Sequence, residues 1–217
     1  MPSQIFFDLD GPLIDISEKF YKLYTDIFVK HHQPTLSSRE YWELKRNKVP
    51  EPDIVSRTTD RDFASKYVPE RLAVIEDLEY LKFDRLHPGV VDLLAELKRK
   101  GDLTLVTLRN NRRNLLWELE HLGLSRYFAN ILTKDDNHGD FRIKVELISE
   151  FCSNNSCQGI LIGDTEADIL AAKALKITSC GVTFGIRTKE IITKLEPDFI
   201  ADSVIEMGQI INRVVGE

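Results

Sequence analysis

Short runs of apolar residues alternate along this chain with segments in which apolar residues recur every three or four positions. The runs have the length of strands, and most are apolar at consecutive positions. Such runs are expected in a parallel sheet that helices cover on both faces. The predicted strands are Gln4–Leu9, Leu103–Leu108, Ala129–Thr133, Gly159–Gly163 and Thr178–Thr183, with Asp198–Ala201 as a candidate edge strand.

The segments between these runs have the periodicity of amphipathic helices. The predicted helices are Val90–Lys100, Asn111–Leu122, Ile143–Phe151 and Glu166–Leu175. The first two end at Gly101 and Gly123, and glycine is common just after the last turn of a helix. Strands that alternate with helices in this way predict an α/β fold with a doubly wound parallel sheet.

Residues 16–85 break this alternation. They contain helical patterns at about Glu18–His31, Arg39–Arg46 and Glu70–Leu81, which prolines separate. The aromatic stripe of Phe20, Tyr24 and Phe28 is expected to form the core of this segment rather than a ligand site. We therefore predict two domains: a catalytic core of residues 1–15 and 86–217, and a small inserted α-helical domain of residues 16–85.

Length and charge narrow the class of protein. The 217 residues suit one large domain or a core with a small insert. The net charge is −6 and the longest basic run is 98–100, so a nucleic-acid partner is not expected. No apolar run approaches the roughly 20 residues that span a bilayer. The first residues do not have the pattern of a signal peptide, so we predict a cytoplasmic protein without a membrane partner.

The cysteines are Cys152, Cys157 and Cys180, and their spacing is not that of a CxxC motif. We expect reduced, partly buried thiols. A disulfide between the first two, or a pair of zinc ligands, is the less favoured alternative.

Polar residues gather where the predicted strands end. Asp8 and Asp10 end the first strand, Thr107 the second, and Asp164 the fourth, with Asp168 one turn later and Lys144 opening the helix after the third. Ligands bind at the carboxyl ends of the strands in open α/β sheets. Four neighbouring carboxylates would repel one another, and a divalent cation removes that conflict. Hard oxygen ligands favour Mg²⁺.

This set of residues can carry out phosphoryl chemistry. Asp8 can attack phosphorus and form an aspartyl-phosphate. Asp10 can act as general acid/base, protonating the leaving oxygen and later deprotonating water. Gly11 suits a tight turn that directs backbone N–H groups toward a phosphoryl group.

The same residues resemble the motifs of the haloacid dehalogenase-like hydrolases. Residues 7–13, Phe-Asp-Leu-Asp-Gly-Pro-Leu, are similar to the first motif, DxDGT, and residues 105–107 to the second, an apolar strand that ends in Thr or Ser. Lys144 matches the lysine of the third motif. Residues 162–169, followed by a helix, resemble the fourth, GDxxxD. The motifs occur in the family's order across most of residues 5–185.

This resemblance implies a Rossmann-like core with a helical cap inserted after the first motif, most similar to the phosphoglycolate phosphatase type. It implies that Asp8, the backbone carbonyl of Asp10 and Asp164 hold Mg²⁺, with Asp168 supporting the site. It also implies that Thr107, Leu108 and Lys144 bind the phosphoryl group. An Asp at position 10, rather than the Tyr or Ala of other branches, favours phosphoesters.

The chain departs from the family pattern at three positions. Pro12 replaces the usual Thr, Leu108 stands where Asn is frequent, and Val145 where Pro is common. Pro12 is the position that bears on turnover. Just past the second motif, Arg109, Arg112 and Arg113 are expected to be a solvated start of a helix, with substrate steering as the alternative.

The predicted function is Mg²⁺-dependent hydrolysis of a small phosphorylated metabolite, a phosphate monoester, by a monomer or homodimer. The alternatives are a sugar-phosphate phosphomutase and a catalytically weak or regulatory member of the same fold. Specificity is expected to depend on side chains of the inserted domain, with Lys45, Arg46 and Arg57 as candidates.

Overall fold

The computed structural model describes residues 4–135, 140–153 and 157–216. Contacts between Cα atoms divide the chain into two compact units. One comprises Met1–Asp15 and Arg85–Glu217, and the other Ile16–Asp84. Each unit is described separately.

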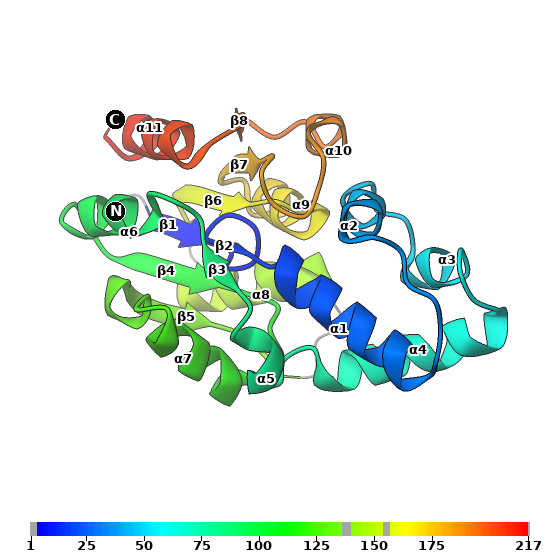
Figure 1. Cartoon of the computed structure of the whole chain (residues 1–217). Coiled ribbons are helices and arrows are strands. Elements are labelled where there is room, and N and C mark those ends of the chain that lie inside the picture. The colour runs from blue at the N-terminus through cyan, green and yellow to red at the C-terminus, as the bar shows by residue number, and fades with distance from the viewer. Residues whose placement is uncertain (1–3, 136–139, 154–156, 217) are drawn as a thin grey trace. The chain divides into compact units, whose positions relative to one another are not determined.

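The first unit is built on a six-stranded parallel sheet in the order β5-β4-β1-β6-β7-β8 (Figure 1). Its strands are β1 (Gln4–Phe7), β4 (Leu103–Val106), β5 (Phe128–Leu132), β6 (Gly159–Gly163), β7 (Thr178–Val182) and β8 (Phe199–Ala201). The strand order reverses at β1. In open α/β sheets this reversal opens a crevice at the carboxyl ends of the strands, where ligands bind. The predicted doubly wound α/β fold is thus confirmed.

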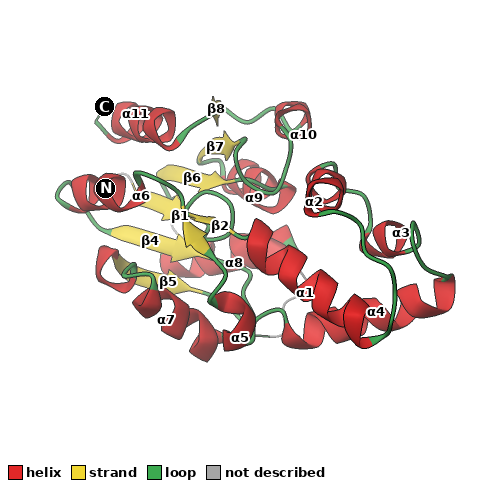
Figure 2. Cartoon of the chain, in the orientation of Figure 1, coloured by secondary structure: helices red, strands yellow, loops and turns green. Residues whose placement is uncertain are grey.

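Helices cover both faces of this sheet (Figure 2). They are α6 (Val90–Lys98), α7 (Arg112–His121), the 3₁₀ turn η1 (Ser125–Tyr127), α8 (Phe141–Phe151), α9 (Glu166–Leu175), α10 (Lys189–Lys194) and α11 (Val204–Val215). Helices α8 and α9 pack against each other over a core that includes Phe6, Val106 and Leu161. Helices α6 and α11 pack together, with Gly208 against Leu93.

The strands end earlier than the apolar pattern predicts. β1 stops at Phe7 rather than Leu9, and β4 at Val106 rather than Leu108. Leu9 is fully buried although it lies outside the strand. The apolar pattern indicates which side chains are buried but not where the backbone leaves the sheet, so the first residues of the loops after β1 and β4 were predicted as strand.

The chain crosses between the two units at a short antiparallel ribbon. Strand β2 (Ile14–Asp15) pairs with β3 (Arg85–Leu86), and this pair belongs to the first unit. Two-residue strands carry no readable alternation, so the sequence analysis contains no prediction for them.

The second unit is helical. Its helices are α1 (Ser17–Lys30), α2 (Ser38–Arg46), α3 (Glu51–Val55), α4 (Arg61–Val74) and α5 (Leu78–Leu81). Its core is aromatic: Tyr24 stacks on Tyr41, with ring centroids 4.5 Å apart, and Phe28 meets Phe63 edge to face at 5.0 Å. Phe20, Tyr24 and Phe28 are all buried, as expected of a packed core.

The predicted helix Glu70–Leu81 was wrong. Helix α4 begins at Arg61 and continues through Pro69 to Val74, and α5 is separate. The side chain of Asp60 caps α4 by accepting a hydrogen bond from the N–H of Phe63 at 2.9 Å. A proline was taken as a helix boundary, but the buried face of Phe63 and Tyr67 stabilises the helix around it.

The expectation of reduced thiols was also wrong for two of the three cysteines. Cys152 and Cys157 form a disulfide, with Cα atoms 5.7 Å apart, and Cys180 is free and buried. This separation lies within the range that a disulfide requires. Among the described residues, no helix is both long and apolar enough to cross a membrane.

Candidate active site

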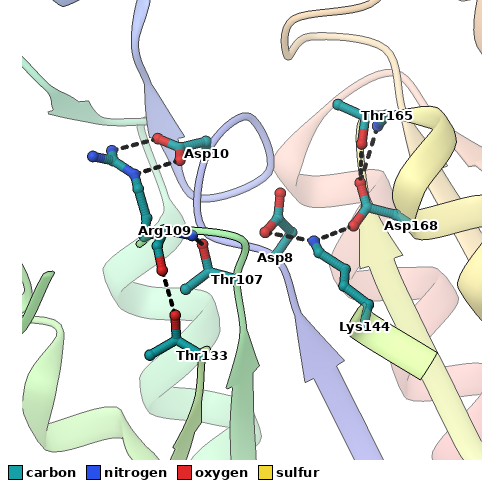
Figure 3. A network of polar contacts seen from close by, with 8 residues as sticks. All are labelled: Asp8, Asp10, Thr107, Arg109, Thr133, Lys144, Thr165 and Asp168. Carbon is teal, nitrogen blue, oxygen red and sulfur yellow. Dashed lines mark hydrogen bonds and ion pairs between the residues drawn. The ribbon is translucent and has the colours of Figure 1, made fainter. Parts of the chain in front are cut away.

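A buried lysine connects two of the predicted acids at the carboxyl ends of β1 and β6. Lys144, in the first turn of α8, is 1% exposed. Its Nζ lies 2.7 Å from Oδ1 of Asp8 and 2.5 Å from Oδ1 of Asp168 (Figure 3). Asp8 is held by its own backbone, which donates to the carbonyl of Ile162 at 2.8 Å. Residues far apart in the chain therefore meet at the predicted edge of the sheet.

Asp168 is fixed by a capping box at the start of α9. Its second carboxylate oxygen accepts from the N–H of Thr165 at 3.1 Å and from the hydroxyl of Thr165 at 2.7 Å. The carboxylate therefore caps its own helix and pairs with Lys144. Its orientation is set before any ligand binds.

Asp164 completes the acidic group and is fully buried. Its Oδ2 accepts a hydrogen bond from the N–H of Ile186, whereas its Oδ1 is buried without a hydrogen-bond partner in the described structure. Two glycines leave space for this carboxylate: a Cβ on Gly11 would lie 2.1 Å from its Cγ, and one on Gly185 2.2 Å from its Oδ2. Gly11 also has a φ of +102°, which other residues rarely adopt.

The loop after β1 is closed by backbone hydrogen bonds. The N–H of Gly11 donates to the carbonyl of Ile14 at 2.9 Å, and Nε2 of His87 donates to the carbonyl of Gly11 at 2.8 Å. Pro12 is buried within this loop. Neither bond requires an N–H group at position 12, so a proline there does not disrupt them.

Burial dominates the electrostatics of the acidic group. It raises the pKa of Asp8 to about 7; Lys144 opposes this rise, while Asp168 and Asp10 add to it. Burial and the nearby Asp168 and Asp8 carboxylates also raise the pKa of Asp164 well above its usual value. Burial lowers the pKa of Lys144, but its two acidic partners outweigh that effect and raise it. One buried ammonium thus does not compensate three carboxylates.

These residues fit a hard divalent cation. One oxygen from each of Asp8, Asp164 and Asp168 lies within 4.8 Å of the others. The unpartnered oxygen of Asp164 is aligned by the backbone of Ile186 and buried, so a cation would satisfy it. All the available ligands are oxygens, which suits Mg²⁺ or Ca²⁺ rather than a softer metal.

Asp10 pairs with a different positively charged side chain, that of Arg109. Both of its carboxylate oxygens accept hydrogen bonds from Arg109, Oδ2 from Nε and Oδ1 from Nη2, each at 2.7 Å (Figure 3). Behind Arg109 lies Glu118 of α7, which is fully buried and 3.5 Å from the guanidinium. In Figure 3 the carboxylate of Asp10 points toward Arg109 and away from Lys144.

The loop after β4 carries the two remaining predicted residues. Thr107 is 1% exposed, and its hydroxyl accepts from the N–H of Arg109 at 3.3 Å. Leu108 is half-buried between them. The hydroxyl of Thr133 donates to the carbonyl of Arg109 at 2.5 Å and ties this loop to the end of β5.

The expectation of a solvated arginine cluster holds for Arg112 and Arg113, which are exposed, but not for Arg109, which is 6% exposed. Helix α7 starts at Arg112, so Arg109 lies in the loop at the carboxyl end of β4. The strand-end rule that selected Thr107 applies equally to Arg109. A second signal was Glu118, an acid on the buried face of α7 beside Leu115 and Leu119.

Comparisons with known proteins identify the family to which this fold belongs. The sequence profile of the haloacid dehalogenase-like hydrolases matches residues 5–182. A phosphoglycolate phosphatase from Vibrio parahaemolyticus is 29% identical over 133 residues, 60% of this chain and 58% of that protein. A pyrophosphatase from Oceanobacillus iheyensis is 23% identical over 95% of each chain. A haloacid dehalogenase-like family hydrolase from Streptococcus pneumoniae has the same fold: its TM-score is 0.78 at 23% identity, over 96% of this chain and 98% of that one.

The chain therefore belongs to the haloacid dehalogenase-like hydrolase family. This confirms the predicted family and the prediction of a hydrolase. The match to the phosphoglycolate phosphatase spans little more than half of that protein, whereas the pyrophosphatase is matched almost end to end.

Proposed function

We propose that this chain is a Mg²⁺-dependent phosphatase that hydrolyses a small phosphate monoester through an aspartyl-phosphate on Asp8. The observation that carries the proposal is the buried group of Asp8, Asp164 and Asp168 around Lys144, at the strand reversal of a haloacid dehalogenase-like fold. A group with more negative charge than it can compensate is suited to bind a cation and a phosphoryl group together.

In the proposed reaction, an oxygen of Asp8 bonds to phosphorus while the bond from phosphorus to the ester oxygen breaks. Asp10 gives that oxygen its proton. Water then attacks the phosphorus, passes a proton to Asp10, and inorganic phosphate leaves Asp8. Lys144 holds the nucleophile through its 2.7 Å ion pair, and the loop at Thr107 and Leu108 is the proposed phosphoryl-binding segment.

The proposed ligands of Mg²⁺ are the carboxylates of Asp8 and Asp164 and the backbone carbonyl of Asp10, with Asp168 supporting them. When bound, the ion supplies positive charge that offsets the repulsion between the carboxylates and a phosphoryl group. The helical unit of residues 16–84 is the proposed cap. In that unit Lys45, a candidate for substrate contact, is an ion-pair partner of the half-buried Glu51. The cytoplasmic location and the monomeric or dimeric state stay predictions.

A second candidate is hydrolysis of pyrophosphate. The pyrophosphatase relative aligns over 95% of the chain, whereas the phosphoglycolate phosphatase relative aligns over 60% of it. Phosphoglycolate and pyrophosphate share one chemical feature, since each carries a second anionic group close to the phosphoryl group that is transferred. The same catalytic residues could serve either substrate.

The test is phosphate release from 4-nitrophenyl phosphate, pyrophosphate and a panel of phosphorylated metabolites, with Mg²⁺. The variant Asp8→Asn is expected to lose about 10³-fold or more in kcat, because an amide is a poor nucleophile. Asp102→Asn, an exposed acid between α6 and β4, is the matched control and should retain the wild-type rate. Full activity in Asp8→Asn would refute the proposed nucleophile.

A further inference from the structure

The pairing of Asp10 with Arg109 has a layered arrangement. Glu118 is innermost, with a fully buried side chain; the side chain of Arg109 is 7% exposed; and that of Asp10 is 25% exposed. Asp10 is therefore the outermost member and the one that an incoming ligand meets first. Thr107 and Thr133 hold the loop of Arg109 through the N–H and the carbonyl of that residue.

This pairing conflicts with the role proposed for Asp10. Both of its oxygens accept hydrogen bonds from the guanidinium, so in this arrangement neither is directed at a leaving group. Bidentate pairs of this kind combine two charge-assisted hydrogen bonds with fixed geometry. Asp10 must give up at least one of these bonds before it can meet the ester oxygen. Another anion is expected to replace it on Arg109, because the guanidinium would otherwise exchange two 2.7 Å hydrogen bonds for the more distant Glu118, 3.5 Å away.

We propose that a second anionic group of the substrate takes the place of Asp10 on Arg109, and that the released Asp10 takes up a proton from solvent water and gives it to the leaving oxygen. The exchange conserves charge pairing, because one anion replaces another on the same guanidinium. It rests on the proposed phosphatase function. Arg109 is then a specificity-determining residue, and the favoured substrates are phosphate esters that carry a carboxylate or a further phosphate near the ester oxygen.

Arg109 then links the choice of substrate to proton transfer by Asp10. A substrate without a second anion leaves Asp10 on Arg109 and reacts slowly if its leaving group needs a proton. An aryl phosphate such as 4-nitrophenyl phosphate has a leaving group that departs without a proton, so its hydrolysis depends less on the exchange.

The experiment compares three substrates in the wild type and in Arg109→Met: 2-phosphoglycolate, 2-hydroxyethyl phosphate and 4-nitrophenyl phosphate. The first two differ in a carboxylate and are otherwise matched in size. The wild type is expected to prefer 2-phosphoglycolate in kcat/KM, and Arg109→Met to lower that preference about tenfold or more, since two charge-assisted hydrogen bonds are lost. Arg109→Lys keeps the positive charge but cannot form the bidentate pair, so it should restore only part of the preference for 2-phosphoglycolate.

The control is Arg113→Met, an exposed arginine on the same segment, which should keep the wild-type preference. If Arg109→Met fails to fold because Glu118 loses its ion pair with Arg109, the double variant Arg109→Met/Glu118→Gln removes both charges and should show the same loss of preference. An unchanged preference in the folded single or double variant overturns the inference.

The same assay distinguishes failure of the proposed role of Arg109 from failure of the proposed phosphatase function. If wild-type protein releases no phosphate even from 4-nitrophenyl phosphate, the phosphatase function is overturned and with it the role of Arg109. If the wild type hydrolyses 4-nitrophenyl phosphate through Asp8 but does not distinguish 2-phosphoglycolate from 2-hydroxyethyl phosphate, only the role of Arg109 is overturned.

Discussion

Two acids that are two residues apart in the chain have opposite electrostatic surroundings. Asp8 shares one ammonium, that of Lys144, with Asp168, and Asp164 lies within ligand distance of both. Asp10 has a guanidinium bound to both of its oxygens, with one further acid, Glu118, behind it. The first group has an excess of negative charge and an unpartnered oxygen, whereas the second is closely paired.

The difference teaches what each group needs in order to function. The group around Asp8 is already arranged to receive a cation, since its carboxylates are aligned by Lys144, by the capping box of α9 and by the N–H of Ile186. In the group around Asp10, both oxygens of Asp10 are already bound by Arg109, so this group must instead rearrange. Ligand binding is therefore expected to add a cation beside Asp8. Beside Asp10 it is expected to replace one partner of Arg109 with another.

The largest expected effect is that of metal removal, which acts on the group around Asp8. With a chelator, hydrolysis should be lost. Without metal, the folded protein retains a proton on Asp8 between the usual pKa of 3.8 and about 7, while the unfolded chain has lost it. The free energy of unfolding therefore falls as the pH rises through this window and stays lowered above it. Asp164, whose pKa is also raised, acts in the same direction.

Saturating Mg²⁺ should reduce this pH dependence, and at about 100 times Kd it should add about 2.7 kcal/mol to the free energy of unfolding. Urea unfolding curves from pH 4 to 8, with Mg²⁺ and with chelator, measure both effects. Curves that coincide at every pH would show that the acidic group binds no cation.

An intermediate effect is expected from Lys144→Met. It leaves the carboxylates of Asp8 and Asp168 buried without their ammonium, and breaking such a pair typically costs about 3–5 kcal/mol. Lys134→Met is the control, because that lysine forms an exposed pair with Glu146 and should change stability by about 0–1 kcal/mol. Both are measured by urea unfolding in chelator. If the two variants lose the same stability, the charges around Asp8 are already compensated.

The smallest expected effect is that of Gly185→Ala, which separates the two groups. The new Cβ would displace Asp164 and should lower the affinity for Mg²⁺ about tenfold, as changes that misalign metal ligands do. Gly101→Ala, with no atom within 4 Å of its Cβ, is the control. At saturating Mg²⁺ the substrate preference that depends on Arg109 should be unchanged. A shifted preference would mean that the two groups are coupled through the loop after β1. Calorimetric titration with Mg²⁺ and the three-substrate assay measure the two quantities.

The sequence predicted much of this arrangement, because strand ends and their polar residues are local features. The runs that became β1, β4 and β6 were recognisable, and Asp8, Thr107 and Asp164 follow them directly. The inserted helices were recognisable as a group but not in their bounds, as α4 shows: aromatic packing overrides the signal of Pro69. The disulfide was not predictable either, since its formation depends on how the chain turns after α8.

By itself the sequence determined the kind of fold, the edge of the sheet at which the candidate site lies and the identity of the acids there. Only the tertiary structure decided which basic side chain pairs with which acid. Asp10 and Arg109 are 99 residues apart, and Lys144 and Asp168 are 24 apart. Whether such side chains pair depends on their direction, their burial and their neighbours from other elements. Those quantities arise from packing in three dimensions, so residue type and spacing along the chain do not contain them.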